Sequence, residues 1–218
     1  MRTAEYYGAH GAAYSWRELE KTYLALCGRE QAASPDPLYE IELSEVFAEL
    51  YRIRGQDPDE RLVSETALFF RIASTKKLRL YPWTLPVIKL VREKGAGVYH
   101  QSNAQSCFTV PELRFLGISN AFDGMVLSSD AGVRKPSPAI MRRLLDENGL
   151  DPSSCIMIGN DRRSDVAVAH ACGIDAVYIE TETSGGFDPG FIAEYELTDG
   201  RAKELPRLIS ALLEANDA

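Results

Sequence analysis

The sequence predicts a mixed α/β protein in which a small helical domain precedes a larger domain built on a parallel sheet. From about Ser15 to Lys77, apolar residues recur at helical spacing and almost no strand pattern is visible. From about Leu80, short apolar runs alternate with helical segments. Such alternation indicates parallel β-α-β units with right-handed crossovers. We therefore place the helical domain at residues 1–79 and the α/β domain at residues 80–218.

Three helical segments and one connection account for most of the first domain. In the first segment, Leu19, Tyr23 and Leu26 share one face, and Ser15 with Glu18 resembles a capping box. The others are LSEVFAELYRIRG, with Ser44 before its apolar stripe and Gly55 after it, and ERLVSETALFFRIAS, and the connection between the first two is AASPDPLYEIE.

The second domain shows helices and strands in turn, with glycines where helices end. The expected helices cover residues 86–91, 110–116, 137–148, 166–172 and 205–214, and the expected strands cover residues 97–100, 124–128, 156–158 and 176–179. In open parallel sheets, ligands bind at the carboxyl ends of the strands. The residues that follow each strand are therefore the first place to look for a site.

Composition narrows the class of protein. The net charge is −8 and the pI is about 5.0, which argues against a nucleic-acid partner because such proteins carry a basic patch. The four cysteines show no CxxC pairing, and Cys155 and Cys172 lie in apolar runs, so we expect core thiols in a reducing compartment. No apolar run is long enough to span a bilayer, and the first residues lack the pattern of a signal peptide. We expect a cytoplasmic protein without a membrane partner.

Two carboxylates follow the strand at residues 156–158. The chain breaks at Gly159 and then presents Asn160, Asp161 and Asp165. Two close carboxylates repel each other unless a cation or a proton lies between them, and Mg²⁺ is a hard cation that oxygen ligands suit. In the other interpretation, Asp165 only caps the following helix, because aspartate is a favoured N-cap residue.

Two further strand ends carry polar residues. Ser102 and Asn103 follow the strand at 97–100, and small donors before a helix suit an anion. Lys135 lies in the loop after the strand at 124–128, where it would neutralise a bound phosphate. Taken singly, a serine in this position is more often a cap and a lysine is more often solvated. The combination in order along the chain is more specific than either.

These motifs together resemble those of the haloacid dehalogenase (HAD) superfamily of phosphohydrolases. QSN is similar to its second motif, RKPSP to its third and IGNDRRSD to its fourth. The resemblance covers the whole chain and implies a Rossmann-like core with a parallel sheet at residues 80–218 and a helical cap at residues 1–79. It also implies a small phosphorylated metabolite as substrate and Mg²⁺ as cofactor.

The resemblance assigns roles by position. Ser102 would bind the transferring phosphoryl group with help from Asn103, and Lys135 would offset the charge shared by the phosphate and the nucleophile. Asp161 and Asp165 would hold Mg²⁺. Many relatives have the first carboxylate directly after the glycine, where this chain has Asn160, so either Asn160 or Asp161 takes that position.

The first motif of the family has no counterpart in this sequence. Relatives open with a strand that ends in Asp-x-Asp or Asp-x-Tyr-Gly-Thr, and its first aspartate is the nucleophile that forms an aspartyl-phosphate. Here the first residues resemble a cap helix, and no aspartate follows an apolar strand before the cap. In the family this strand lies between the strands that end at Gln101 and Gly159. We expect a longer natural protein to supply it, in which Met1 is an internal residue and not the true start.

Three functions follow from this pattern. The first is a Mg²⁺-dependent phosphatase whose nucleophile lies outside residues 1–218, so that this chain alone is inactive. The second is a haloacid dehalogenase, which needs no metal. Asn160, in the place of the first carboxylate, is compatible with this function. The third is a non-catalytic binding or regulatory protein that retains an anion pocket.

Overall fold

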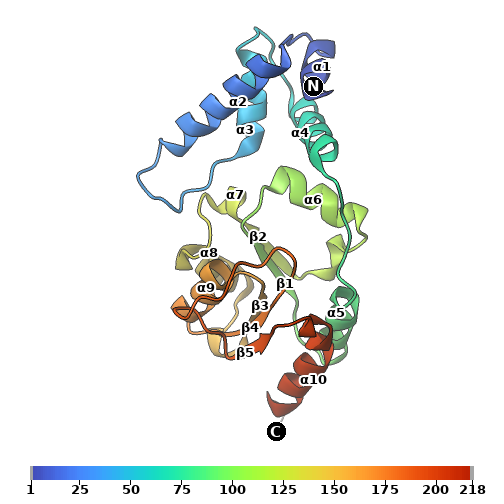
Figure 1. The fold of residues 1–218 in the computed structure, drawn as a ribbon, viewed down its shortest axis with the longest axis vertical. Coiled ribbons are helices and arrows are strands. Elements are labelled where there is room, and N and C mark those ends of the chain that lie inside the picture. Colours follow the sequence, from blue (N-terminus) through green and yellow to red (C-terminus); the bar gives the residue numbers. More distant parts are fainter. Residues whose placement is uncertain (1, 217–218) are drawn as a thin grey trace. The chain divides into compact units, whose positions relative to one another are not determined.

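The computed structural model describes residues 2–216 and divides them into two compact units (Figure 1). The helical unit contains the residues up to Arg79 together with Asn103–Ser119 and Leu127–Gly132. The sheet unit contains Leu80–Ser102, Asn120–Val126 and the residues from Val133 onward. The first segment of the helical unit ends at Arg79, and two later segments also belong to this unit. The roles of cap and core stay predictions.

The helical unit is built around aromatic side chains. Tyr7, Phe47 and Tyr51 are almost completely buried in it. The Tyr7 hydroxyl donates to the Phe47 carbonyl oxygen at 3.1 Å, and the Tyr51 hydroxyl shares a hydrogen bond of 2.9 Å with the Thr66 hydroxyl. Both phenols thus have the polar partner that a buried hydroxyl needs. The helices of this unit are α1 (Arg2–Ala9), α2 (Trp16–Gln31), α3 (Leu43–Arg52), α4 (Glu60–Ser74), α6 (Ser106–Phe115) and the short α7 (Ser128–Ala131).

Side chains cap the starts of α2, α3 and α4. Ser15 caps α2 as predicted, and its hydroxyl accepts a hydrogen bond from the Glu18 amide. Helix α3 already includes Ser44, the residue before its apolar stripe, and its cap is Glu42. The expected helix at 110–116 begins earlier, at Ser106, and contains Pro111. This proline lies inside the helix, where it cannot donate the backbone hydrogen bond of an ordinary residue.

The sheet unit alternates strands and helices. Its elements are α5 (Thr84–Glu93), β1 (Tyr99–Ser102), β2 (Gly124–Leu127), α8 (Pro138–Asn148), β3 (Ile156–Gly159), the π-helical turn η3 (Arg162–Val166), α9 (Ala167–Ala171), β4 (Asp175–Ile179), β5 (Tyr195–Leu197) and α10 (Leu205–Asn216). Short 3₁₀ turns occur at Ser119–Ala121, Pro152–Ser154 and Arg201–Glu204. The strand expected at 97–100 is shifted toward Ser102, and the strand at β5 was not expected.

The strands form two sheets. One sheet pairs β1 with β2, and the other has the order β3-β4-β5. The second is parallel, with Met157 opposite Ala176 and Val177 opposite Tyr195. In residues 2–216 no strand joins β1 to β3. This break falls where the family resemblance places the strand of the first motif.

The burial of the strand residues agrees with the missing pairing between β1 and β3. Three residues of β4 and two of β2 are buried, whereas β1 and β3 have none. Ile156 at the start of β3 is 39% exposed. Inner strands of parallel sheets are normally buried on both faces and paired on both edges. In this structure β1 and β3 are therefore edge strands, each with one unpaired row of backbone groups.

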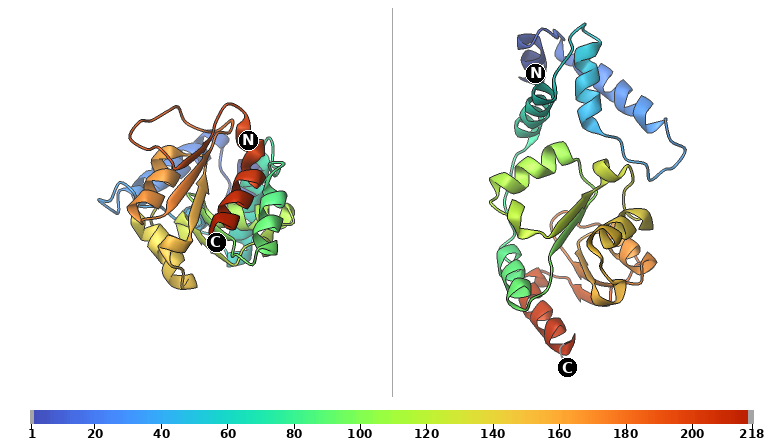
Figure 2. Two further views of the ribbon diagram at one scale, coloured as in Figure 1. Left: turned by 90° about the horizontal axis from the view of Figure 1, so that it is seen from below. Right: turned by 180° about the vertical axis from the view of Figure 1, so that it is seen from behind.

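Helix α10 lies beside α5 and closes one side of the sheet unit (Figure 2). The apolar cluster between these elements contains Val87, Val177, Leu197, Leu205 and Ile209. In the part of the chain that the structure describes, no helix is both long and apolar enough to cross a bilayer. All four cysteines are free and half-buried, including Cys155 and Cys172.

Candidate functional site

Lys135 links the carboxyl ends of β1 and β3. Its ammonium donates to the Asp165 carboxylate at 2.6 Å and to the Gln101 carbonyl oxygen at 3.3 Å. Gln101 belongs to β1, and Asp165 lies in η3, the turn after β3. Lys135 and Asp165 are 7% and 6% exposed, so this ion pair is buried. Strand ends that are far apart in sequence thus meet around one ammonium group.

The Asp165 carboxylate is fully engaged. One oxygen, Oδ1, accepts from Lys135. The other, Oδ2, accepts from the backbone amides of Asn160 at 2.9 Å and Asp161 at 3.0 Å. A buried carboxylate needs this set of donors, because an unpaired buried charge is costly.

Gly159 makes this approach possible. A Cβ atom built at Gly159 would lie 2.3 Å from Asp165 Oδ2, closer than non-bonded atoms come. The glycine at the end of β3 is therefore required by the folded-back carboxylate and not by a left-handed backbone conformation.

The turn after β3 differs from the predicted one. One of the two interpretations of the sequence, in which Asp165 only caps a helix over 166–172, is wrong, because its carboxylate binds Lys135 and two amides instead. Asp161 is the N-cap, and its carboxylate accepts from the Arg163 amide at 3.0 Å. A π-helical turn follows and leads into α9 (Ala167–Ala171). Single π-helical turns occur often at functional sites.

The donor set for Mg²⁺ is only partly in place. Asp161 is exposed, and its Oδ1 accepts from the Arg163 amide while its other oxygen is open to a further ligand. Asp165 offers no oxygen without losing a hydrogen bond. Within residues 2–216, no three His, Cys, Asp or Glu side chains gather as a metal site would require. The oxygen chemistry suits Mg²⁺, but the arrangement does not by itself form a site.

The side-chain carboxamide of Asn160 binds two threonines, whereas its backbone amide binds the Asp165 carboxylate. Its Nδ2 donates to the Thr181 hydroxyl at 2.9 Å and to the Thr183 hydroxyl at 3.0 Å. Both threonines follow β4, which is the neighbour of β3. Neither threonine was recognised from the sequence, although residues after the strand at 176–179 obey the same carboxyl-end rule.

Ser102 and Asn103 are placed differently. Ser102 ends β1 and is half-buried, directly after Gln101, whose carbonyl oxygen Lys135 binds. It therefore belongs to the same strand end as Lys135's partner. Asn103 is exposed and falls in the helical unit.

His100 contributes an uncharged ring near these groups. Burial, and to a lesser degree the Lys135 charge, lowers the pKa of His100 to about 4. Its ring packs against Phe122 with centroids 5.1 Å apart, and the buried Nδ1 atom has no hydrogen-bond partner among the described residues. At neutral pH this histidine adds no positive charge to the site.

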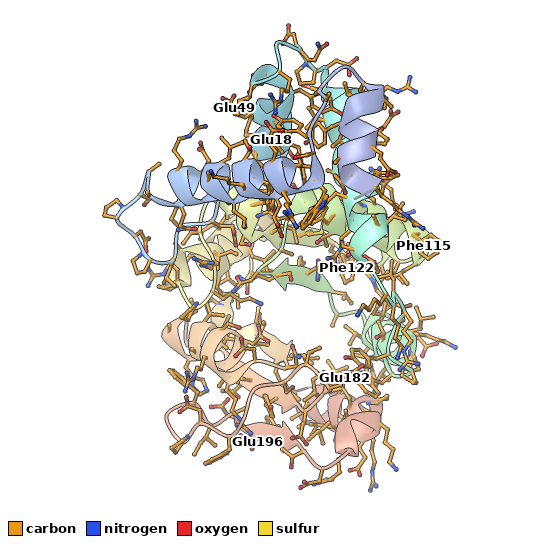
Figure 3. All side chains as sticks on the ribbon, turned by 45° about the horizontal axis from the view of Figure 1, so that its top comes forward. Glu18, Glu49, Phe115, Phe122, Glu182 and Glu196 are labelled. Atoms are coloured by element: carbon orange, nitrogen blue, oxygen red, sulfur yellow. The ribbon has the colours of Figure 1, made fainter. Side chains whose placement is uncertain are left out.

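A second ion pair, also missed from the sequence, joins a buried arginine to a half-buried glutamate and holds the turn in place. Arg162 in η3 binds Glu196 of β5, which Figure 3 labels, with Nη2 and Oε2 separated by 2.9 Å. Its guanidinium also stacks over the Tyr178 ring at 3.8 Å from the ring centre. The hydrogen bonds from Arg162 hold the pKa of Glu196 below its usual range. The turn that carries Asp161 and Asp165 is thereby fixed to β4 and β5.

Comparison with known proteins identifies the family. Residues 6–173 match the family model of haloacid dehalogenase-like hydrolases. Among curated relatives, the glyceraldehyde 3-phosphate phosphatase of Methanopyrus kandleri is 28% identical over 70% of this chain and 70% of its own length. The phosphoserine phosphatase of Thermus thermophilus is 27% identical over 62% of this chain. That match and the one to the phosphoglycolate phosphatase of Yersinia pestis span only 53% and 54% of those relatives' lengths.

Solved structures show the same fold. A HAD phosphatase from Thermococcus onnurineus aligns with a TM-score of 0.57 and 20% identity, over 87% of this chain and 78% of its own. A 2-haloacid dehalogenase from Pseudomonas syringae aligns with a TM-score of 0.66 and 18% identity, over 96% of this chain and 88% of its own. At 20% and 18% identity, these alignments show a shared fold and do not show which reaction the chain catalyses. The match of the family model over most of the chain shows that the protein belongs to the haloacid dehalogenase-like hydrolases.

Proposed function

We propose that the chain supplies the phosphate-handling part of a Mg²⁺-dependent phosphatase that acts on small phosphomonoesters. The observation that carries this proposal is the buried Lys135 ammonium, which is fixed between the Gln101 carbonyl oxygen and the Asp165 carboxylate. The three curated relatives described above are named as phosphatases of small metabolites, which supports the same reaction class.

Each residue has a chemical task in this proposal. Lys135 is the catalytic cation that offsets charge on the phosphoryl group, and a buried ammonium does so more strongly than an exposed one because local screening is weaker. Ser102 donates a hydrogen bond to a phosphoryl oxygen, and Asn103 assists it. Asp165 orients Lys135 between reactions.

The nucleophile belongs, in this proposal, to an additional strand between β1 and β3. The split sheet supports it, as does the absence of any buried residue from these two strands. An apolar strand there would pair with both open edges, and an aspartate at its carboxyl end would lie near Lys135. That carboxylate would take the phosphoryl group as an aspartyl-phosphate, which water then hydrolyses.

We assign Mg²⁺ binding to Asp161 and Asp165. Mg²⁺ usually takes one or two protein carboxylates and completes its shell with water and phosphate. When bound, the ion would neutralise charge on the phosphoryl oxygens. Asp161 has an open oxygen for this purpose, whereas Asp165 must first give up a donor.

Calorimetric titration with inorganic phosphate, with and without Mg²⁺, tests the proposal. We expect Lys135→Met to abolish phosphate binding and Asp161→Asn to remove only its enhancement by Mg²⁺. Lys89→Met is the control, because Lys89 is 76% exposed and pairs only at the helix surface with Glu93. Equal phosphate affinity in the wild type and Lys135→Met would contradict the proposed site.

A non-catalytic anion-binding protein is the second candidate. The saturation of Asp165 by Lys135 and two amides favours it, because a site already neutralised needs no metal. This candidate predicts phosphate binding that Mg²⁺ does not enhance.

A further inference from the structure

Two threonine hydroxyls at the end of β4 hold the side chain of Asn160. Nδ2 of Asn160 donates to Thr181 Oγ1 at 2.9 Å and to Thr183 Oγ1 at 3.0 Å. The two hydroxyls also bond to each other at 3.1 Å. Both N–H groups of the carboxamide are therefore used within this cluster, which we call the threonine bracket (Thr181 and Thr183).

Asn160 connects the threonine bracket to the buried ion pair. Its backbone amide donates to Asp165 Oδ2 at 2.9 Å, while Asp165 Oδ1 accepts from Lys135 at 2.6 Å. Asn160 thus links two parts of the sheet unit: its side chain binds the loop after β4, and its backbone amide binds the Asp165 carboxylate after β3. The direction of the Lys135 ammonium depends on where this carboxylate is held.

The same two loops are joined at other points. Arg163 binds Asp188 with Nε and Oδ2 separated by 2.7 Å, and Arg162 Nη1 donates to the Phe191 carbonyl oxygen at 3.3 Å. The segment 181–191 is therefore fastened along its length to the turn after β3. Asn160 is the contact in this set that also touches Asp165.

We propose that Asn160 is a positioning residue for Lys135, acting through Asp165, and that it is not a ligand for Mg²⁺. The proposal rests on the proposed function, because Lys135 is taken as the phosphate-binding cation. The threonine bracket fixes the Asn160 carboxamide, and this fixes the backbone amide that holds Asp165. A site held in this way keeps its cation in place before phosphate arrives.

Phosphate titration without Mg²⁺ separates the two roles. Asn160→Ala and the double variant Thr181→Val/Thr183→Val should each weaken phosphate binding about three- to tenfold, which is the effect of one or two lost hydrogen bonds. Combining all three changes should add little, because they break one chain of contacts. Thr181→Ser/Thr183→Ser keeps both hydroxyls and should bind phosphate like the wild type.

If Asn160 were a metal ligand, Asn160→Ala would weaken phosphate binding only in the presence of Mg²⁺, and the valine variant would have no effect. Either result overturns the proposal. A loss of thermal stability in the valine variant with unchanged phosphate affinity would show a merely structural bracket, and would overturn it as well.

Labelling of Lys135 with an amine-reactive reagent, followed by mass spectrometry, tests the positioning independently of phosphate. Lys135 is 7% exposed, so the wild type should react slowly. Asn160→Ala and the valine variant should react several-fold faster, and the serine variant should not. Faster labelling in a chain that binds no phosphate would uphold the positioning role and reject the phosphate site, whereas unchanged labelling in both variants would reject the positioning role.

Discussion

Removing the Lys135 ammonium should destabilise the fold more than any surface substitution. Lys135→Met leaves the Asp165 carboxylate in place, and the two side chains are 6% and 8% exposed. Removing one partner of a buried ion pair costs about 3–5 kcal/mol, because the other charge stays buried. Two backbone amides still bind Asp165, so we expect a loss in unfolding free energy near the lower end, about 3 kcal/mol.

Urea denaturation of a double-mutant cycle measures this loss. Asp165→Asn retains an acceptor for the backbone amides, and the double variant should recover about 1–3 kcal/mol of the summed single losses. Arg61→Met is the control, since Arg61 and Glu65 form an exposed pair that contributes about 0.5 kcal/mol or less. Single losses below about 1 kcal/mol, or strictly additive losses, would refute the buried pair.

Three further predictions concern pH, capping and metal. His100 has a pKa of about 4 in the folded protein against 6.5 normally, mainly through burial, so the unfolded chain binds more protons between these values and stability should fall as the pH drops through this range. Urea midpoints of the wild type and of His100→Asn, each measured at both ends of this pH range, test this prediction. The midpoint should change less with pH in His100→Asn than in the wild type, and an equal change in both proteins would contradict the prediction. Ser15→Ala removes the cap of α2 and should lower the free energy of unfolding, measured by chemical denaturation, by about 1 kcal/mol. Ser15→Thr should retain most of this stability, because threonine also caps helices. Mn²⁺ as a spectroscopic substitute for Mg²⁺ should bind more tightly to Lys135→Met, which frees an Asp165 oxygen, and less tightly to Asp161→Asn; the reverse order would contradict the assigned ligands.

Local signals predicted local structure well. The Ser15 cap is found as expected, and the helix at 137–148 ends at Gly149, whose φ of 63° suits glycine. Both features depend on residues a few positions apart. Apart from α7 and β5, the order of strands and helices in the second domain was also predicted, because hydrophobic periodicity is set within each element.

Long-range contacts explain what was missed. Asp165 was a reasonable helix cap by sequence, but Lys135, distant in the chain, binds its carboxylate and leaves capping to Asp161. The strand at β5 has three residues and is defined by pairing with β4, so it carries too little periodicity to be recognised. The same holds for Arg162, whose partner Glu196 lies on that strand.

The sequence named residues of the candidate site but predicted few of the contacts between them. The sequence pointed to the residues after successive strands, because ligands bind at the carboxyl ends of parallel strands, and in the structure Lys135 contacts Asp165. The threonines that bind Asn160 were not recognised, since isolated hydroxyls after a strand have many structural uses. Ser102, Asn103 and the Mg²⁺ ligands stay predictions.

Turnover of a generic phosphomonoester, measured with Mg²⁺, tests the central claim most directly. The comparison is between residues 1–218 alone and the same chain preceded by an apolar strand that ends in Asp-x-Asp. We predict no activity in the shorter chain, because the described residues near Lys135 include no activated nucleophile, and activity in the longer chain that Lys135→Met abolishes. Mg²⁺-dependent turnover by the shorter chain, lost in Lys135→Met, would contradict the account.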